Sequence, residues 1–290
     1  MTSTPPTDTA RTDTATGRPA AAPAPADRIA IDTSRPHPAR VYDWFLGGKD
    51  NYPVDEELGR QIVALEPQTK YCARHNRWFM QRATRHLART GTRQFLDIGT
   101  GIPTAPNLHT VAQRVNPEAR VVYVDNDPIV LAHAEALLTS TPEGATAYLQ
   151  ADAREPDRIA ELARDVLDFT EPVAVSLIAL LHFIPDADGA YDVVGKLVDA
   201  LPSGSHLVLT QLSADFDPVR TRQAVEMYRA GGVTLVPRTR EETERFFTSA
   251  GLDLVDPGIG WLPDWQPHLG VDEERDGTPV PLYAGVGRKP

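Results

Sequence analysis

The sequence predicts an α/β fold of the doubly wound type, in which helices cover both faces of a mostly parallel sheet. From residue 94 onward, short apolar runs alternate with segments of helical pattern, which is typical of successive βαβ units. The run at residues 173–180 is apolar almost throughout, as expected of a strand that is covered on both faces. Directly after the first run stand Gly99 and Gly101, at the position where folds of this type hold a ligand.

The individual strands and helices follow from the same patterns. The apolar runs predict strands at residues 94–98, 120–124, 147–150, 173–180, 205–212, 252–255 and 282–288. The segments between them predict helices at residues 106–115, 128–138, 156–168, 191–200 and 239–251. Asp127 is placed to cap the second of these helices, and Thr239 with Glu242 forms a capping box for the last. We therefore expect one domain at residues 91–290.

The first 90 residues divide into two segments of different character. Residues 1–35 are dominated by Thr, Ala, Pro and Asp and contain few large apolar side chains, so we expect a disordered tail. Residues 36–90 predict an N-terminal helical cap or lid. Within it, an apolar cluster at 41–46 leads into a glycine-containing loop, and helical patterns follow at 54–65 and 69–90.

The composition indicates which binding partners and which cellular location to expect. The formal net charge is −11, whereas a protein that grips nucleic acid must supply an excess of Lys and Arg, so no nucleic-acid partner is expected. No apolar run is long enough to span a bilayer and no signal segment is visible, so we expect no membrane association and a cytoplasmic location. Cys72 is the single cysteine, which excludes an internal disulfide. No metal site is expected.

Three acidic side chains follow three successive predicted strands. Asp97 lies at the end of the first, and Asp125 ends the second, 125 − 97 = 28 residues later. Asp152 follows the third, 152 − 125 = 27 residues further on. Because parallel strands end at one edge of a sheet, we expect these acids to share a crevice with Gly99 and Gly101, with Asp125 accepting ribose hydroxyls and Asp152 an adenine amine. Each feature alone also fits a plain turn or a surface carboxylate, but together they favour an adenosine-containing ligand.

The glycine loop favours S-adenosylmethionine over a dinucleotide. A dinucleotide-binding loop needs a third glycine where this chain has Thr104. Asp97 precedes the loop, and a carboxylate there repels a pyrophosphate but attracts an ammonium group. S-adenosylmethionine contains no phosphate and carries an ammonium group on its amino acid tail. The charge pattern therefore predicts S-adenosylmethionine as the cofactor.

Four separated motifs carry a family resemblance. They are ARVYD with LGGKDN at residues 39–51, DIGTGIPT at 97–104, YVDNDP at 123–128 and LLHFIPD at 180–186. Through them the chain resembles the class I S-adenosylmethionine-dependent methyltransferases and, more narrowly, a bacterial S-adenosyl methyltransferase family once described as a domain of unknown function. The resemblance implies a Rossmann-like, seven-stranded sheet whose last strand is antiparallel, with cofactor contacts at the first glycine and at the second and third acids. The resemblance does not specify the methyl acceptor.

The predicted cofactor contacts come from the glycine loop, the strand-end acids with their neighbours, and the cap. They are Asp97, Gly99, Thr100, Gly101, Asp125, Asn126, Asp152, Ala153, Tyr42 and Lys49. Tyr42 and Lys49 belong to a glycine-hinged segment, residues 42–52, of the kind that folds over a site as a lid. The alternative is a docking element that covers the edge of the sheet with Trp44 and Phe45.

His182 is the candidate acceptor-side base, because it follows the fourth predicted strand and is expected at the mouth of the same crevice. The alternative is that it packs over the cofactor or binds a backbone carbonyl. Asn76 and Arg77 are candidates for the cofactor's carboxylate or an acidic substrate, or else belong to a solvated helix face. Trp261 and Trp265 either form an aromatic wall for the acceptor or fill the space beneath a long connection.

The sequence thus predicts an S-adenosylmethionine-dependent methyltransferase that acts on a small-molecule acceptor. The acceptor's identity and the oligomeric state are not predicted. Two other functions remain open at this point. One is a non-catalytic S-adenosylmethionine-binding regulatory protein, which would keep the crevice without an acceptor pocket. The other is a nicotinamide-dependent oxidoreductase, against which Thr104 and Asp97 argue.

Overall fold

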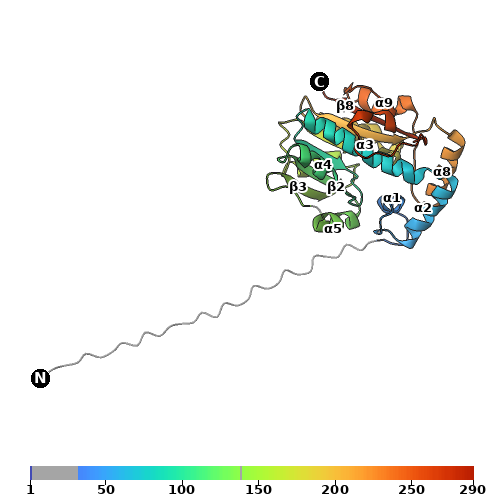
Figure 1. Cartoon of the computed structure of the whole chain (residues 1–290), viewed down its shortest axis with the longest axis horizontal. Coiled ribbons are helices and arrows are strands. Elements are labelled where there is room, and N and C mark those ends of the chain that lie inside the picture. The colour runs from blue at the N-terminus through green and yellow to red at the C-terminus, as the bar shows by residue number, and fades with distance from the viewer. Residues whose placement is uncertain (2–31, 138) are drawn as a thin grey trace. The chain divides into compact units, whose positions relative to one another are not determined.

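The computed structural model describes Met1 and residues 32–137 and 139–290. Most of the predicted tail, residues 1–35, lies outside the described residues. The remainder forms a sheet with helices packed on both of its faces (Figure 1). Within the described residues, no helix combines the length and the apolar character that crossing a bilayer requires.

The sheet contains every predicted strand and one more. Its strands are β1 (Gln94–Ile98), β2 (Arg120–Asp125), β3 (Ala145–Gln150), β4 (Val173–Leu177), β5 (His206–Leu212), β6 (Asp253–Leu254), β7 (Gly260–Trp261) and β8 (Leu282–Arg288). They lie in the order β3-β2-β1-β4-β5-β8-β6, with β7 paired to β8. Strands β1 to β5 are parallel, and β8 is antiparallel to β5. The predicted seven-stranded sheet therefore has eight strands in the described residues, because the two-residue β7 is too short to leave an apolar run.

Nine helices surround the sheet in the described part of the chain. They are α1 (Pro38–Leu46), α2 (Pro53–Leu65), α3 (Thr69–Arg89), α4 (Leu108–Val115), α5 (Pro128–Leu137), α6 (Pro156–Ala163), α7 (Ala190–Asp199), α8 (Pro218–Ala230) and α9 (Arg240–Thr248). Alternate side chains of the strands face opposite layers. Phe95 packs with α3 and α4 in one core, whereas Leu96 and Ile98 pack with α6, α7 and α9 in the other.

Local signals explain several of the boundaries. The capping box at α9 is confirmed: Thr239 Oγ1 accepts from the Glu242 N–H, and the Glu242 carboxylate accepts from the Thr239 N–H. The Ile129 N–H donates to Asp127 Oδ1 at the start of α5. The predicted strand at 173–180 was too long, because β4 ends at Leu177. The predicted helix at 156–168 was also too long, because α6 ends at Ala163.

The N-terminal helices do not form a cap alone, because α8 joins them. Helices α1, α2, α3 and α8 share a third core, made by Val41, Phe45, Leu58, Ile62, Ala73, Tyr228, Val233 and Leu235. Figure 1 shows α1, α2 and α8 close to one another. Phe45 lies in this core and Trp44 packs over Gly59 of α2, so neither covers the sheet edge that the docking alternative assigned to them. The cap is thus built from two distant parts of the sequence.

Candidate functional site

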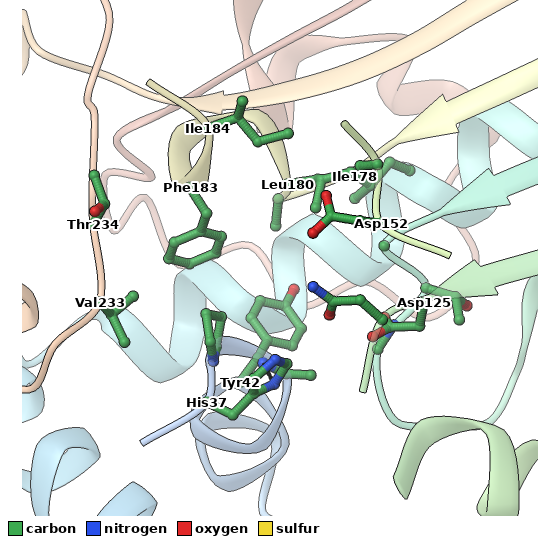
Figure 2. A pocket seen from close by; sticks show the side chains of 18 of the residues that line it. His37, Tyr42, Asp125, Asp152, Ile178, Leu180, Phe183, Ile184, Val233 and Thr234 are labelled. Carbon is green, nitrogen blue, oxygen red and sulfur yellow. Dashed lines mark hydrogen bonds between the residues drawn. The ribbon is translucent and has the colours of Figure 1, made fainter. Parts of the chain in front are cut away.

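A cavity of about 410 Å³ opens at the carboxyl ends of β1 to β4. Nine of the ten predicted cofactor contacts line it: Asp97, Gly99, Thr100, Gly101, Asp125, Asn126, Asp152, Ala153 and Tyr42. In Figure 2 the rings of Tyr42 and Phe183 lie across the cavity from Asp125 and Asp152. The three strand-end acids therefore converge on one cavity, as the strand spacing predicted.

The glycine loop is held by hydrogen bonds to the neighbouring strand. The N–H groups of Gly99 and Thr100 both donate to the carbonyl of Val124, over 2.8 and 3.1 Å. Gly99 has φ +71°, and a Cβ built on it would lie 2.6 Å from Leu180 Cδ1. Glycine is required at this position both for the left-handed backbone and for the space.

Asp97 is a buried carboxylate that lacks a full counter-charge. It is 8% exposed, and burial raises its pKa to about 6, while Thr100 and the Arg77 guanidinium act in the opposite direction. Arg77 is committed to the adjacent loop, because its Nη2 donates to the carbonyls of Thr104 and Pro106 over 2.5 and 3.2 Å. A cation entering the cavity beside Asp97 would be stabilised.

Asp125 and Asp152 differ in their electrostatic surroundings. Burial raises the pKa of Asp125, although its oxygens accept from the backbone N–H groups of Asp127 and Gly101, each over 2.9 Å. Hydrogen bonds from the Arg154 side chain lower the pKa of Asp152, with Nε and Nη2 donating to its two oxygens over 2.9 and 2.8 Å. Asp152 is therefore held ionised as a hydrogen-bond acceptor at the edge of the cavity.

An ionic cluster fastens the start of the cap beside these acids. His37 Nδ1 lies 3.2 Å from Asp127 Oδ2, and Arg40 Nε lies 3.5 Å from the same oxygen. Arg40 also lies 3.8 Å from Asp55, which accepts from the backbone N–H of His37 over 2.8 Å. Sequence analysis missed this cluster, because its members come from the cap and from the turn between β2 and α5, with no shared spacing.

Lys49 is the exception among the predicted cofactor contacts. It is exposed and does not line the cavity. Asp43 fixes the loop that contains Lys49. Its Oδ2 accepts hydrogen bonds from the Asp50 N–H and from Asn51 Nδ2 over 3.0 and 2.8 Å. The polar residues of this motif therefore shape the loop itself, and a cofactor contact at Lys49 stays a prediction.

A second cavity, of about 150 Å³, adjoins the first. His182 lines it and is 6% exposed, and its Nδ1 has no hydrogen-bond partner among the described residues. Burial, and secondarily Arg238, lowers the pKa of His182 to about 3, so the imidazole is neutral at physiological pH. His182 does not line the first cavity, where it was expected. It lines only the second cavity, beyond the residues that the two cavities share.

Comparisons with known proteins show the family of this chain. The chain matches the S-adenosyl methyltransferase family over residues 24–290. It belongs to that family. A crystal structure of a DUF574 family protein from Streptomyces avermitilis MA-4680 is 46% identical, with TM-score 0.85, and the match covers 90% of this chain and 100% of that chain. A methyltransferase candidate from Thermobifida fusca YX is 41% identical, with TM-score 0.80 and coverage of 89% and 96%. No curated protein matches this chain.

S-adenosylmethionine is the cofactor of this family, and the residues present fit it. Asp97 offers a buried carboxylate to an ammonium group, and Gly99 lets the backbone approach closely. Asn76 lines the cavity with a buried Oδ1 that lacks a partner in the described part of the chain, while its Nδ2 donates to Tyr42. The Asp97 carboxylate is thus the acceptor in this cavity that fits the ammonium group of the cofactor's amino acid tail.

In this member of the family, Arg238 holds the turn that carries His182. The guanidinium is 1% exposed and donates to the carbonyls of Leu181 and Ile184, each over 2.8 Å, and to Asp186 over 2.6 Å. Sequence analysis missed Arg238, since no local pattern marks an arginine that reaches back over more than 50 residues. The Asp of the LLHFIPD motif is one of its partners.

The two tryptophans that were candidates for an aromatic wall have structural roles in this protein. Trp265 is buried against Phe79, and its carbonyl accepts from Arg82, so it fills the space beneath the long connection. Trp261 stacks on Tyr283 of β8. Neither tryptophan lines either cavity.

Proposed function

We propose that this chain transfers the methyl group of S-adenosylmethionine to a small-molecule acceptor. The observation that carries the proposal is the convergence of Asp97, Asp125 and Asp152 with the glycine loop on one cavity, next to a second cavity of apolar character. The first cavity suits the cofactor, and the second leaves room for a reaction partner.

Each acid has a distinct role in this proposal. Asp97 binds the ammonium group of the amino acid tail, because its carboxylate is buried and in need of a positive partner. Asp125 binds the ribose hydroxyls, and Asp152 with Ala153 binds the adenine edge. Asn126 and Thr100 complete the wall between these contacts.

When bound, S-adenosylmethionine supplies a methyl carbon that the acceptor's lone pair attacks as the carbon–sulfur bond breaks. The chain's contribution is to align the acceptor and to exclude water, and such alignment is worth ~7–11 kcal/mol. His182 lies at the acceptor side, where its neutral ring accepts or donates a hydrogen bond. Its low pKa opposes full protonation, so we assign it an orienting role in preference to that of a general base.

The cap covers the cofactor in this proposal. Pro36, His37, Pro38 and Ala39 line the cofactor cavity with Tyr42, and the ionic cluster at Arg40 fastens them there. Tyr42 is held in turn, because its hydroxyl donates to the Ala73 carbonyl over 3.0 Å. Entry of the cofactor requires this segment to move, which is the behaviour of a lid.

The competing functions are less well supported. A pyrophosphate placed at the glycine loop would face the buried carboxylate of Asp97, and Arg77 is committed to backbone carbonyls, so a nicotinamide dinucleotide fits poorly. A binding protein without catalysis would have no use for a second cavity at the cofactor's reactive end.

Ligand binding and turnover test the proposal in two stages. Thermal unfolding should show stabilisation by S-adenosylmethionine and S-adenosylhomocysteine but not by NAD, and a ligand at 100 times its Kd adds ~2.7 kcal/mol. Labelled methyl from S-adenosylmethionine should then enter a component of a metabolite extract. Stabilisation by NAD alone would overturn the cofactor assignment, and binding without any labelled product would favour the regulatory protein.

A further inference from the structure

We propose that the second cavity receives the methyl acceptor, and that the acceptor is a neutral molecule of about one aromatic ring bearing one hydroxyl or amine group. The inference rests on the proposed function and goes beyond it by naming the substrate class. Four properties of the cavity carry it: its position, its size, its unpaired polar atoms and its charge.

The second cavity lies beside the first, where a methyl acceptor could approach the cofactor. The two cavities share Pro38, Tyr42, Asn76, Ala179 and Phe183. The segment of Ala179 follows β4, the strand next to β1, so the shared wall stands at the point where the sheet order reverses. A cofactor with its ammonium group at Asp97 and its ribose at Asp125 would present its reacting end inside the cavity that these five residues border.

The backbone at the shared wall is held in an unusual conformation. Ala179 has φ +54°, which non-glycine residues seldom adopt. Its N–H donates to Oγ1 of Thr210 over 2.8 Å, and Thr210 is fully buried on β5. Such strained residues cluster at functional sites, and here the strain turns the chain between the two cavities.

The size and lining suit a single ring. The lining is mostly apolar, with Phe45, Ile62, Ala73, Leu212, Ala224, Tyr228, Leu235, Pro281 and Leu282 among its members. A volume of about 150 Å³ is that of an apolar cavity that admits benzene.

Two buried polar atoms at this cavity have no partner in the described residues. They are Nδ1 of His182 and Oδ1 of Asn76, in side chains that are 6% and 1% exposed. Buried polar groups are nearly always paired, and an unpaired one costs ~1–3 kcal/mol. A hydroxyl or amine on the acceptor would pair with the ring of His182, which lines the cavity.

The charges at the cavity cancel. Glu66 and Arg220 line it and form an ion pair of 3.4 Å, with side chains 17% and 51% exposed, so they mark the solvent side. Burial raises the pKa of Cys72 to about 12, so this residue remains a neutral thiol. Because no unpaired ionised group lines the cavity in the described residues, a neutral acceptor is favoured over a carboxylate or an ammonium compound.

The transfer step balances with these groups. The lone pair of the acceptor's oxygen or nitrogen forms the new bond to the methyl carbon, and the electrons of the broken carbon–sulfur bond remain on sulfur as the thioether. The proton of the acceptor leaves to water on the side of Glu66 and Arg220. His182 orients the acceptor by a hydrogen bond and undergoes no net change.

Phenol is the probe that tests the inference, with calorimetric titration in the presence of saturating S-adenosylhomocysteine. Wild-type protein should bind phenol, and the anionic 4-hydroxybenzoate should bind more weakly. Ala224→Phe fills the second cavity without touching the first, so it should weaken phenol binding by about tenfold or more. Ala230→Phe is the matched control on the same helix, because Ala230 is exposed and lines neither cavity.

The outcomes separate this inference from the proposed function. Failure of wild-type protein to bind S-adenosylhomocysteine would overturn the proposed function itself. Normal binding of S-adenosylhomocysteine with no binding of phenol, or with equal phenol binding in Ala224→Phe, would overturn only the acceptor assignment. Binding of S-adenosylhomocysteine also reports folding of the variant, and the milder Ala224→Leu serves if the larger substitution prevents folding.

Discussion

The backbone N–H of Gly101 donates to Oδ2 of Asp125 over 2.9 Å, so the loop after β1 is tied to the carboxylate at the end of β2. This bond joins the two sequence signals on which the cofactor assignment depends. It also orients the carboxylate, whose other oxygen accepts from the Asp127 N–H. The acid is thus positioned before any ligand arrives, which lowers the cost of binding.

Asp125→Asn should weaken S-adenosylhomocysteine binding by roughly 10- to 100-fold, because hydrogen bonds to a charged group contribute ~1.5–3 kcal/mol. Isothermal titration gives the two dissociation constants. Asp157→Asn is the control, since Asp157 is 79% exposed and pairs with Lys196 away from the cavity. Equal affinity in wild type and Asp125→Asn would show that Asp125 does not bind the ribose hydroxyls.

Binding should depend on pH through Asp97, whose pKa is raised to about 6. Thr100, Arg77 and Asp125 are the groups that act on it besides burial. Below pH 6 the carboxylate takes up a proton that an ammonium ligand must displace, so affinity for S-adenosylhomocysteine should fall by about tenfold per pH unit. 5′-Methylthioadenosine lacks the ammonium group, and its affinity should not change in that way. A parallel decline for both ligands would contradict the role of Asp97.

The same carboxylate should reduce the stability of the ligand-free protein. Its folded-state pKa of about 6 exceeds the ordinary aspartate pKa of 3.8, so the free energy of unfolding falls as pH rises from about 4 to 6. The full loss is on the order of 3 kcal/mol. Asp97→Asn should therefore unfold at a higher temperature than wild type at pH 7.5 while binding the cofactor more weakly, and a lower Tm would refute this.

Gly99→Ala should lower stability by ~1–3 kcal/mol and weaken cofactor binding, because the backbone is left-handed and the added Cβ meets Leu180. Gly195→Ala is the matched control. Gly195 lies within α7 with open space around its Cβ position, so the change should be neutral or stabilising by up to ~1 kcal/mol. Chemical denaturation measures both, and similar values for the two variants would exclude strain at the loop.

Arg238→Met should destabilise the protein by ~2–4 kcal/mol, since the buried carbonyls of Leu181 and Ile184 lose their donors. The turn carrying His182 should loosen first, as hydrogen exchange of its amides would show. Arg229→Met removes an exposed pair with Glu226 and should change stability by no more than about 0.5 kcal/mol. An unchanged exchange rate in the turn would show that Arg238 does not hold it.

Proteolysis distinguishes a moving lid from a fixed cap. Lys49 is exposed in the loop after α1, so a lysine-specific protease can cleave there when the segment opens. S-adenosylhomocysteine should slow cleavage after Lys49, whereas NAD should not. Identical cleavage with and without S-adenosylhomocysteine would mean that the cap does not respond to the cofactor.

Patterns that repeat along the chain made the sheet predictable. The buried runs of β1, β2 and β4 are bounded by turn residues, and the spacing of β1, β2 and β3 identified the three acids of the cavity. Helix α8 could not be predicted, because Tyr228 is its single buried residue and no apolar stripe marks it. Without α8, sequence analysis could not show that the second cavity exists.

Long-range partners account for the other gaps. The contacts of His37 and Arg40 with Asp127 join residues about 90 positions apart, and Arg238 pairs with Asp186 across the fold. Such pairs leave no periodic signal, since only the packed structure decides which side chains meet. Lys49 was expected at the site because its motif neighbours belong there, and it does not line the cavity in this structure.

A crystal structure with S-adenosylhomocysteine bound would show whether the three acids hold the cofactor. We expect the amino group within ~3 Å of the Asp97 carboxylate, the ribose hydroxyls on Asp125, and the adenine beside Asp152 and Ala153. The thioether sulfur should face the wall shared with the second cavity. Adenosine density elsewhere on the protein, or an amino acid tail pointing away from Asp97, would contradict the account.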